Sequence, residues 1–238
     1  MNDVFGLALY GYWKGDKRTP HYLRRNDGFL DRTPTGHYFA PKLSVEEKKV
    51  IRYAKGEILD VGCGAGRVGL YLQNKGLTVH GIDTSPLALK VCKARGLKET
   101  HCEDIFKSKL PKNSFDTVIL FGNNIGIAGT VKKAEKLLKK LFNLTKNGGH
   151  LLLTSLDVHK TKNKVHLDYH KANRKKGIPD GEVVIRVEYK KDIGAYFKWL
   201  HVDPQTLKII AKKSGWILKK LYQSKDGQYS AVLEKPNK

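Results

Sequence analysis

The 238-residue chain is poor in cysteine and in acidic residues, and it has no long apolar run. Its three cysteines are an odd number without a Cys-x-x-Cys pair, so neither a disulfide framework nor a structural zinc site is expected. We expect Cys63, Cys92 and Cys102 to be buried as small hydrophobic residues. No apolar run approaches the ~20 residues that span a membrane, and the N-terminus lacks the basic region of a signal peptide. These absences favour a cytoplasmic protein.

The shortage of acidic residues leaves a strongly positive chain, with 23 Asp and Glu against 45 Lys and Arg and a net charge of +22. Such a charge attracts anions, including nucleic acid and phosphorylated or carboxylated small molecules. The basic residues are mostly scattered lysines, whereas arginine, the better fork for bases and phosphates, is scarce. RNA is therefore one possible partner, but net charge alone does not establish a function.

The chain is organised around a glycine-rich stretch. Residues 57–61 contain a short apolar run, which is typical of a strand covered on both faces. The glycines that follow let the backbone turn sharply and approach a ligand closely: Gly62, Gly64 and Gly66. Residues 68–72 then open a helix, whose N-terminus offers free N–H groups to an electronegative ligand. Strand, glycine turn and helix together predict a nucleotide-binding unit.

The spacing of these glycines indicates which nucleotide. A dinucleotide fold requires G-x-G-x-x-G, which would place the third glycine at position 67, where this chain has Arg67. Asp60 also precedes the glycines. The pattern D-x-G-x-G-x-G resembles motif I of the class I S-adenosylmethionine-dependent methyltransferases. A glycine turn without a ligand and a dinucleotide-binding protein of another class are the alternatives.

A second motif supports the same resemblance. Asp83 follows Gly62 by 21 residues, at the end of a predicted strand. In α/β nucleotide folds an acid at this position binds ribose hydroxyls, and a carboxylate can accept hydrogen bonds from both. Thr84 comes next, and then Ser85 and Pro86 are typical of the N-cap and first position of a helix.

Two further loops are weaker matches. The resemblance places Asp104 against the adenine amino group and Ile105 against the ring, although a solvated loop carboxylate is the alternative. The loop after the predicted strand 114–121 lies where α/β sheets bind ligands. It lacks the prolines of the DNA adenine and cytosine methyltransferases. The resemblance thus implies S-adenosyl-L-methionine as cofactor, bound by Asp60, Gly62, Cys63, Gly64, Gly66, Asp83, Thr84, Asp104, Ile105, Phe121 and Asn123.

Periodicity and turn residues predict the other elements. The expected helices are 45–54 behind a Ser44/Glu47 capping box, 66–75, 86–95, 132–145 and 204–213. The expected strands are 57–61, 77–83, 97–102, 114–121 and 150–155, an inserted hairpin over 182–189 and 195–202, and a closing hairpin over 216–222 and 228–234. With the resemblance, this order predicts a doubly wound α/β fold with a seven-stranded, mostly parallel sheet.

We expect residues 1–43 to form an irregular N-terminal cap with one or two short helices. Residues 44–238 would form the methyltransferase domain, with an insertion over the substrate side at 156–202. The cap holds aromatic and histidine side chains that either line a pocket or pack on the core: Tyr10, Trp13, His37 and Tyr38.

The catalytic residues are not identifiable from the sequence. His166 and His170 are spaced i, i+4, but no known metal motif accompanies them. A solvated or substrate-facing insertion is therefore favoured over a metal site, and we expect no metal. Candidate bases are His37, Tyr38, His166 and His170. The predicted function is methyl transfer from S-adenosylmethionine to a small-molecule acceptor. The positive net charge of the chain is compatible with an anionic acceptor. The alternatives are an RNA methyltransferase and a dinucleotide-binding protein.

Overall fold

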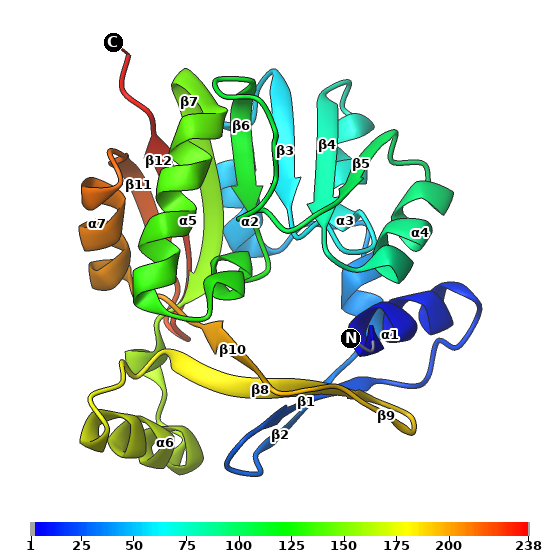
Figure 1. The fold of residues 1–238 in the computed structure, drawn as a ribbon, viewed down its shortest axis with the longest axis vertical. Helices are drawn as coiled ribbons and strands as arrows, with labels where there is room; N and C mark the ends of the chain where they lie inside the picture. Colours follow the sequence, from blue (N-terminus) through cyan, green and yellow to red (C-terminus); the bar gives the residue numbers. More distant parts are fainter. Residues whose placement is uncertain (1–2, 238) are drawn as a thin grey trace. The chain divides into compact units, whose positions relative to one another are not determined.

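The computed structural model describes residues 3–237. Within them it contains one seven-stranded, mostly parallel sheet and one smaller antiparallel sheet (Figure 1). The predicted fold class is therefore confirmed. Contacts group the chain into two units. The first contains the described residues up to Leu43 with Glu57–Lys109 and Val184–Phe197, and the second contains Ser44–Gly56, Leu110–Val183 and the residues from Lys198 onward.

The first unit contains the parallel strands that carry the glycine motif. Strands β3 (Glu57–Val61), β4 (Thr78–Asp83) and β5 (Glu99–Cys102) pair in parallel in that order. Helices α3 (Arg67–Gln73) and α4 (Pro86–Ala94) connect them. Cys102 is exposed because β5 is the edge strand, so the prediction that all three cysteines are buried was wrong for this one.

The N-terminal segment is more regular than predicted. It contains helix α1 (Val4–Trp13), the antiparallel hairpin of β1 (His21–Arg25) and β2 (Leu30–Thr33), and the 3-10 turn η1 (Thr35–Phe39). Strand β1 also pairs with β8 (Glu182–Tyr189), which turns into β9 (Asp192–Ile193). The hairpin of β1 and β2 was not among the expected elements, because β1 shows no apolar alternation. The Asp-Gly turn ahead of β2 was the available signal for the hairpin.

Helix α1 is apolar around most of its circumference because it is packed on more than one side. Val4 and Ala8 form a cluster with Val187 and Tyr189 of the antiparallel sheet. Leu9 belongs to another cluster, which includes Ala65, Ala88 and Val91 from the glycine turn and α4. A helix without a polar face is typical of burial between layers. Its sequence therefore places α1 between the small sheet and the glycine turn.

The second unit contains the remaining strands of the large sheet. These are β6 (Phe115–Leu120), β7 (Thr145–Leu156), β11 (Ile217–Gln223) and β12 (Gln228–Glu234), in the order β11-β12-β7-β6. The β6–β7 pair is parallel, and the pairs that involve β12 are antiparallel. The helices of the unit are α2 (Val45–Ile51), α5 (Val131–Leu144), α6 (Lys164–Lys175) and α7 (Pro204–Lys213).

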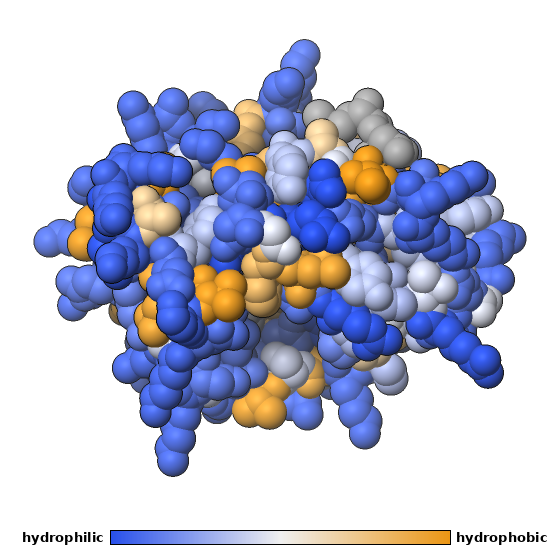
Figure 2. All heavy atoms as spheres, turned by 90° about the horizontal axis from the view of Figure 1, so that it is seen from below, coloured by the Kyte–Doolittle hydropathy of each residue, from blue (hydrophilic) through white to orange (hydrophobic). Residues whose placement is uncertain are grey.

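Short elements complete the second unit: η2 (Asn124–Ala128), η3 (Val158–Lys160) and β10 (Phe197–Leu200). The strand predicted over 195–202 is shorter than expected, because the chain after β8 first forms β9 and then β10. The described residues contain no helix with the length and apolarity to cross a membrane. Figure 2 shows one face on which hydrophilic side chains surround smaller apolar patches.

Candidate functional site

The glycine turn after β3 has a backbone that other residues rarely adopt. Gly62, Gly64 and Gly66 have φ values of +74°, +54° and +78°, a region in which glycine is not penalised. At Gly66 an added Cβ would also lie 2.7 Å from the Cys92 sulfur of α4. Conformation therefore favours glycine at all three positions, and close packing also requires it at Gly66.

The turn is attached to the end of β4 through its backbone. The N–H groups of Gly62 and Cys63 both donate to the carbonyl oxygen of Ile82, at 2.8 and 3.2 Å. Asp83, the next residue, accepts the Gly64 N–H on Oδ2 at 2.9 Å and the Ser85 N–H on Oδ1 at 2.9 Å. The two motifs that the sequence analysis singled out are thus joined by hydrogen bonds.

The Asp83 carboxylate retains hydrogen-bonding capacity. A carboxylate has about four acceptor positions, and the two N–H bonds occupy two of them. Burial raises the pKa of Asp83 above its ordinary value, and the nearby charge of Asp3 raises it further. A partly desolvated acceptor at a strand end has the chemistry needed to bind hydroxyl groups.

Asp3, which was not among the predicted site residues, connects α1 to this region. Its Oδ1 accepts the Gly6 N–H at 2.9 Å, so it is the N-cap of α1. Its Oδ2 accepts the Ser85 hydroxyl at 2.7 Å and the Leu87 N–H of α4 at 3.3 Å. One carboxylate therefore contacts the first turns of two helices. An aspartate directly before an apolar helix was the available signal.

Asp60 and Cys63 are buried, with 3% and 7% of their surface exposed. The Asp60 carboxylate lies under α3, since a Cβ on Gly69 would be 3.4 Å from its Oδ2. A hydrogen bond with Cys92 and burial raise the pKa of the Cys63 thiol, which therefore stays protonated. Gly81 of β4 leaves room for this thiol, because a Cβ there would lie 2.8 Å from the sulfur.

The loop after β5 is brought to Asp83 by its backbone. The Glu103 N–H donates to the Asp83 carbonyl at 3.0 Å. Asp104 accepts the Phe106 N–H on Oδ1 at 2.9 Å, which closes a turn of its own. Ile105 is buried, whereas Thr84 is exposed. The first unit thus brings together most of the residues predicted to bind a cofactor.

Phe121 and Asn123 belong to the second unit. Phe121 is buried, and Asn123 has a left-handed backbone with a φ of +62°. The Asn123 side-chain oxygen is buried without a hydrogen-bond partner among residues 3–237. An orphaned buried amide oxygen is costly, and it indicates a position at which a bound donor would be stabilising.

The N-terminal aromatic residues mostly pack on the core. Tyr10, Trp13 and Tyr38 contact the cluster built on Leu9, whereas His37 is exposed. Burial raises the pKa of Tyr38. Of the two roles open for these side chains, packing is therefore the one observed for three of the four.

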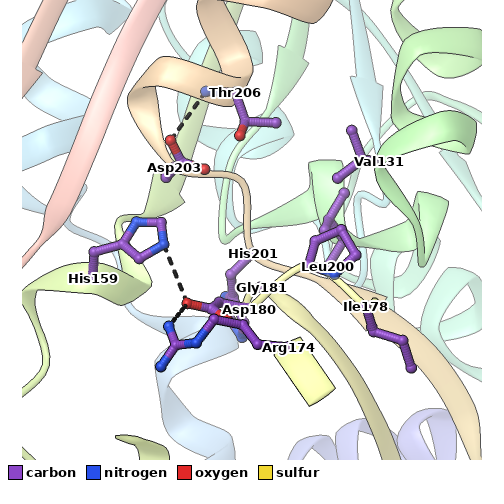
Figure 3. A pocket seen from close by; sticks show the side chains of 11 residues that line it. Val131, His159, Arg174, Ile178, Asp180, Gly181, Leu200, His201, Asp203 and Thr206 are labelled. Carbon is purple, nitrogen blue, oxygen red and sulfur yellow. Dashed lines mark hydrogen bonds and ion pairs between the residues drawn. The ribbon is translucent and has the colours of Figure 1, made fainter. Parts of the chain in front are cut away.

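The second unit has a pocket of about 310 Å³ beside α6 and the start of α7. Figure 3 shows the His159 imidazole and the Arg174 guanidinium converging on Asp180, at 3.5 and 2.6 Å from its Oδ2. Asp203 caps α7 through the N–H groups of Gln205 and Thr206. The pocket combines these polar groups with apolar walls, as small-molecule sites do.

The insertion contains two of the candidate bases, His166 and His170. His166 and His170 lie on α6, and burial lowers the pKa of His170. Burial, with His166 and His170 nearby, lowers the pKa of His201 to about 4. Nowhere in residues 3–237 do three His, Cys, Asp or Glu side chains gather in a way that could hold a metal ion.

Comparison with known proteins agrees with this geometry. The methyltransferase domain family matches residues 59–153. A Geobacillus protein named as a methyltransferase is 28% identical over 131 residues, 52% of each chain. A tRNA (uracil(54)-C(5))-methyltransferase of Pyrococcus horikoshii is 31% identical over 99 residues, 40% of this chain and 23% of that one. This chain thus matches about half, or less, of the length of these curated relatives.

Solved structures extend the likeness over most of the chain. A methyltransferase from Bacteroides fragilis, in complex with S-adenosyl-L-homocysteine, has a TM-score of 0.85 and 28% identity, covering 98% of this chain and 95% of that one. A Methanosarcina mazei structure at 19% identity, with a TM-score of 0.67 and coverage of 83% and 100%, shares the fold. The chain contains a methyltransferase domain, and its fold is that of the class I S-adenosylmethionine-dependent methyltransferases.

Proposed function

We propose that the protein transfers the methyl group of S-adenosylmethionine to a small-molecule acceptor. The observation that carries this proposal is the hydrogen bond between the Gly64 N–H and the Asp83 carboxylate. It joins the glycine turn to an acceptor suited to the ribose hydroxyls. The same glycine spacing disfavours a dinucleotide, because Arg67 stands where the third glycine would be needed.

The residues present fit this cofactor. The glycine turn presents backbone without Cβ atoms, Asp83 offers acceptor positions for two hydroxyls, and Ile105 offers an apolar side chain for a ring. Asn123 has an unpartnered oxygen. We propose that the cofactor is held by Asp60, Gly62, Cys63, Gly64, Gly66, Asp83, Thr84, Asp104, Ile105, Phe121 and Asn123.

The chemistry places modest demands on the protein. The bound cofactor supplies a methyl group on an already activated sulfonium, so the protein's main task is to hold the acceptor in line with it. A base is needed only for an acceptor of high pKa. Among the candidate bases, His170 has a pKa lowered by burial, which keeps its imidazole neutral and able to accept a proton.

We further propose that residues 1–43 act as a cap on a methyltransferase domain of residues 44–238. The contacts of Asp3 with Ser85 and Leu87 support this role, since they tie α1 to the loop that follows Asp83. The insertion 156–202 would shape the acceptor side, and the +22 charge favours an anionic acceptor. All three cysteines are free, which suits the cytoplasmic setting expected for the protein.

RNA is the second candidate acceptor. The net charge of +22 favours it, and one relative that matches over 99 residues is named as a tRNA methyltransferase. We rank it second because the inserted segment and the N-terminal cap are features suited to enclosing a small substrate, and no RNA-binding module is recognisable in the sequence.

A transfer assay separates the two acceptors. The protein would be incubated with S-adenosylmethionine labelled in the methyl group, together with either a small-molecule extract or bulk RNA. We expect label in the small-molecule fraction, and its loss in Asp83→Ala, which removes the acceptor for the ribose. Label in RNA alone would replace the small-molecule assignment. Label in neither fraction, from a protein that also fails to bind S-adenosylhomocysteine, would reject the proposed function.

A further inference from the structure

A groove in the first unit collects positive charge next to the glycine turn. It lies along α3 and the end of α4, has a volume of about 630 Å³, and is lined in part by Arg67, Tyr71, Lys75 and Arg95. No acidic residue lines it. The lining of this groove is therefore basic and neutral, with no carboxylate among its residues.

Arg95 is a partly buried cation in the lining of this groove. Its guanidinium is partly buried, donates to the Ala65 carbonyl oxygen of the glycine turn, and lies 4.9 Å from the centre of the Phe39 ring. It has no carboxylate within ion-pair distance anywhere in residues 3–237. Burial lowers its pKa, because the charged form is poorly solvated there. Buried charges are normally paired, so an anion would stabilise this one.

The chemistry of the groove suits phosphate. A guanidinium presents five N–H donors in a planar fork that matches phosphate oxygens, and one donor of Arg95 is used by Ala65. Lys75 is exposed, with its ammonium 5.3 Å from the centre of the Tyr71 ring. Gln73 is already engaged with Gly96 and Lys98, so its amide supports the wall rather than a ligand.

We propose that this groove binds the sugar-phosphate backbone of an RNA strand. The groove is much larger than a single phosphate requires, the ring of Tyr71 offers an aromatic surface of the kind on which single-stranded bases stack, and the whole chain has a charge of +22. The proposal goes beyond the methyl-transfer reaction, because the RNA is a bound partner whether or not it receives the methyl group.

The test is fluorescence anisotropy with a labelled single-stranded oligouridylate over a salt series. The groove variant carries Lys75→Glu and Arg95→Gln. Its matched control carries Lys132→Glu and Lys136→Gln on the exposed face of α5, with the same change in net charge. We expect the groove variant to bind about tenfold more weakly or worse, and its salt slope to fall by about 1.4, since each phosphate contact on a single strand contributes about 0.7.

The control variant is expected to keep most of the wild-type affinity. Equal losses in both variants would show that RNA is held by diffuse charge and would overturn the proposal, as would a wild-type protein that does not bind the oligonucleotide. Competition by inorganic phosphate at concentrations equal to that of the oligonucleotide phosphate would reassign the groove to a small phosphorylated ligand. Arg95 contacts the glycine turn, so its replacement could disturb the cofactor site as well as the groove. S-adenosylhomocysteine binding to each variant therefore shows whether the fold is intact, and Lys75→Glu alone tests the groove without changing Arg95. Failure of RNA binding leaves the methyl-transfer assay unaffected.

Discussion

Asp83 is the central residue of the candidate site because its carboxylate both holds the neighbouring backbone and can bind a ligand. It accepts backbone N–H groups from both flanking loops, at 2.9 Å each. Its burial and the charge of Asp3 raise its pKa. It therefore organises the glycine turn and at the same time keeps acceptor positions for a ligand. Because protonation of Asp83 removes acceptor positions, we expect ligand affinity to depend on pH.

We predict that affinity for S-adenosylhomocysteine falls as the pH drops from neutral towards the ordinary aspartate value of 3.8, beginning above that value. The sign follows from the direction of the shift: a raised pKa means that Asp83 takes up its proton at a higher pH, and the protonated acid accepts fewer hydroxyl hydrogen bonds. Isothermal titration calorimetry across this range measures the effect.

The Asp83→Asn variant is the matched control for this prediction. It should bind about tenfold to a hundredfold more weakly at neutral pH, because hydrogen bonds to a charged group are worth roughly 1.5–3 kcal/mol. Its affinity should then vary little over the acidic range. Equal pH profiles for the wild type and the variant, in protein that remains folded, would show that Asp83 does not contact the ligand.

Site residues whose identity is set by the local backbone could be predicted from the sequence. Site residues whose identity is set by contacts with distant parts of the chain could not. The three glycines follow from their positive φ, and Asp83 follows from its place at a strand end. The link between Asp3 and Ser85 was missed because the two residues are 82 positions apart. Gly81 was missed because packing against Cys63 and Leu97, rather than a local turn, requires it.

At the scale of the element, helix caps were the most predictable feature because they are chemically local. Ser44 with Glu47 forms the expected capping box of α2, Ser85 caps α4, and Asp203 caps α7. The N-terminal hairpin was not predicted, since its strands are completed by pairing with β8, more than a hundred residues later. Whether these residues form strands therefore depends on a distant pairing partner rather than on their own sequence.

Asp3 and Ser44 are both helix N-caps, but only Asp3 also contacts the candidate cofactor site. Replacement of either by Ala should cost about 1 kcal/mol of stability, with a range of roughly 0.5–2, because each removes a cap hydrogen bond. Only Asp3→Ala should also weaken S-adenosylhomocysteine binding, since only Asp3 ties α1 to the loop after Asp83. Thermal unfolding and calorimetry measure the two effects. Equal affinities in the two variants would mean that α1 has no role in cofactor binding.

At the scale of the whole molecule, acid stability should depend on a buried histidine. His21 of β1 has no exposed surface, and its Nδ1 lies 3.1 Å from the Thr35 hydroxyl. Burial, and to a lesser degree the charge of His37, lowers its pKa from 6.5 to about 4. The unfolded chain then binds a proton below pH 6.5 that the folded protein does not accept until about pH 4. Stability is therefore lost as the pH falls through this window.

We predict that His21 alone accounts for a loss of up to about 3 kcal/mol of unfolding free energy between these two pH values, at about 1.4 kcal/mol for each pH unit. His21→Gln, which keeps a neutral polar side chain, should flatten this part of the profile. The exposed His37→Gln should keep most of the slope. Urea unfolding at a series of pH values measures it, and a variant with the wild-type slope would assign the acid sensitivity to other groups.

The central claim is that the glycine turn and Asp83 bind S-adenosylmethionine rather than a dinucleotide. Its most direct test is calorimetric titration of the purified protein with S-adenosylhomocysteine and, separately, with NADH. We predict binding of one molecule of S-adenosylhomocysteine per chain, no heat of binding with NADH, and loss of the S-adenosylhomocysteine signal in Asp83→Ala. Binding of NADH without binding of S-adenosylhomocysteine would contradict it.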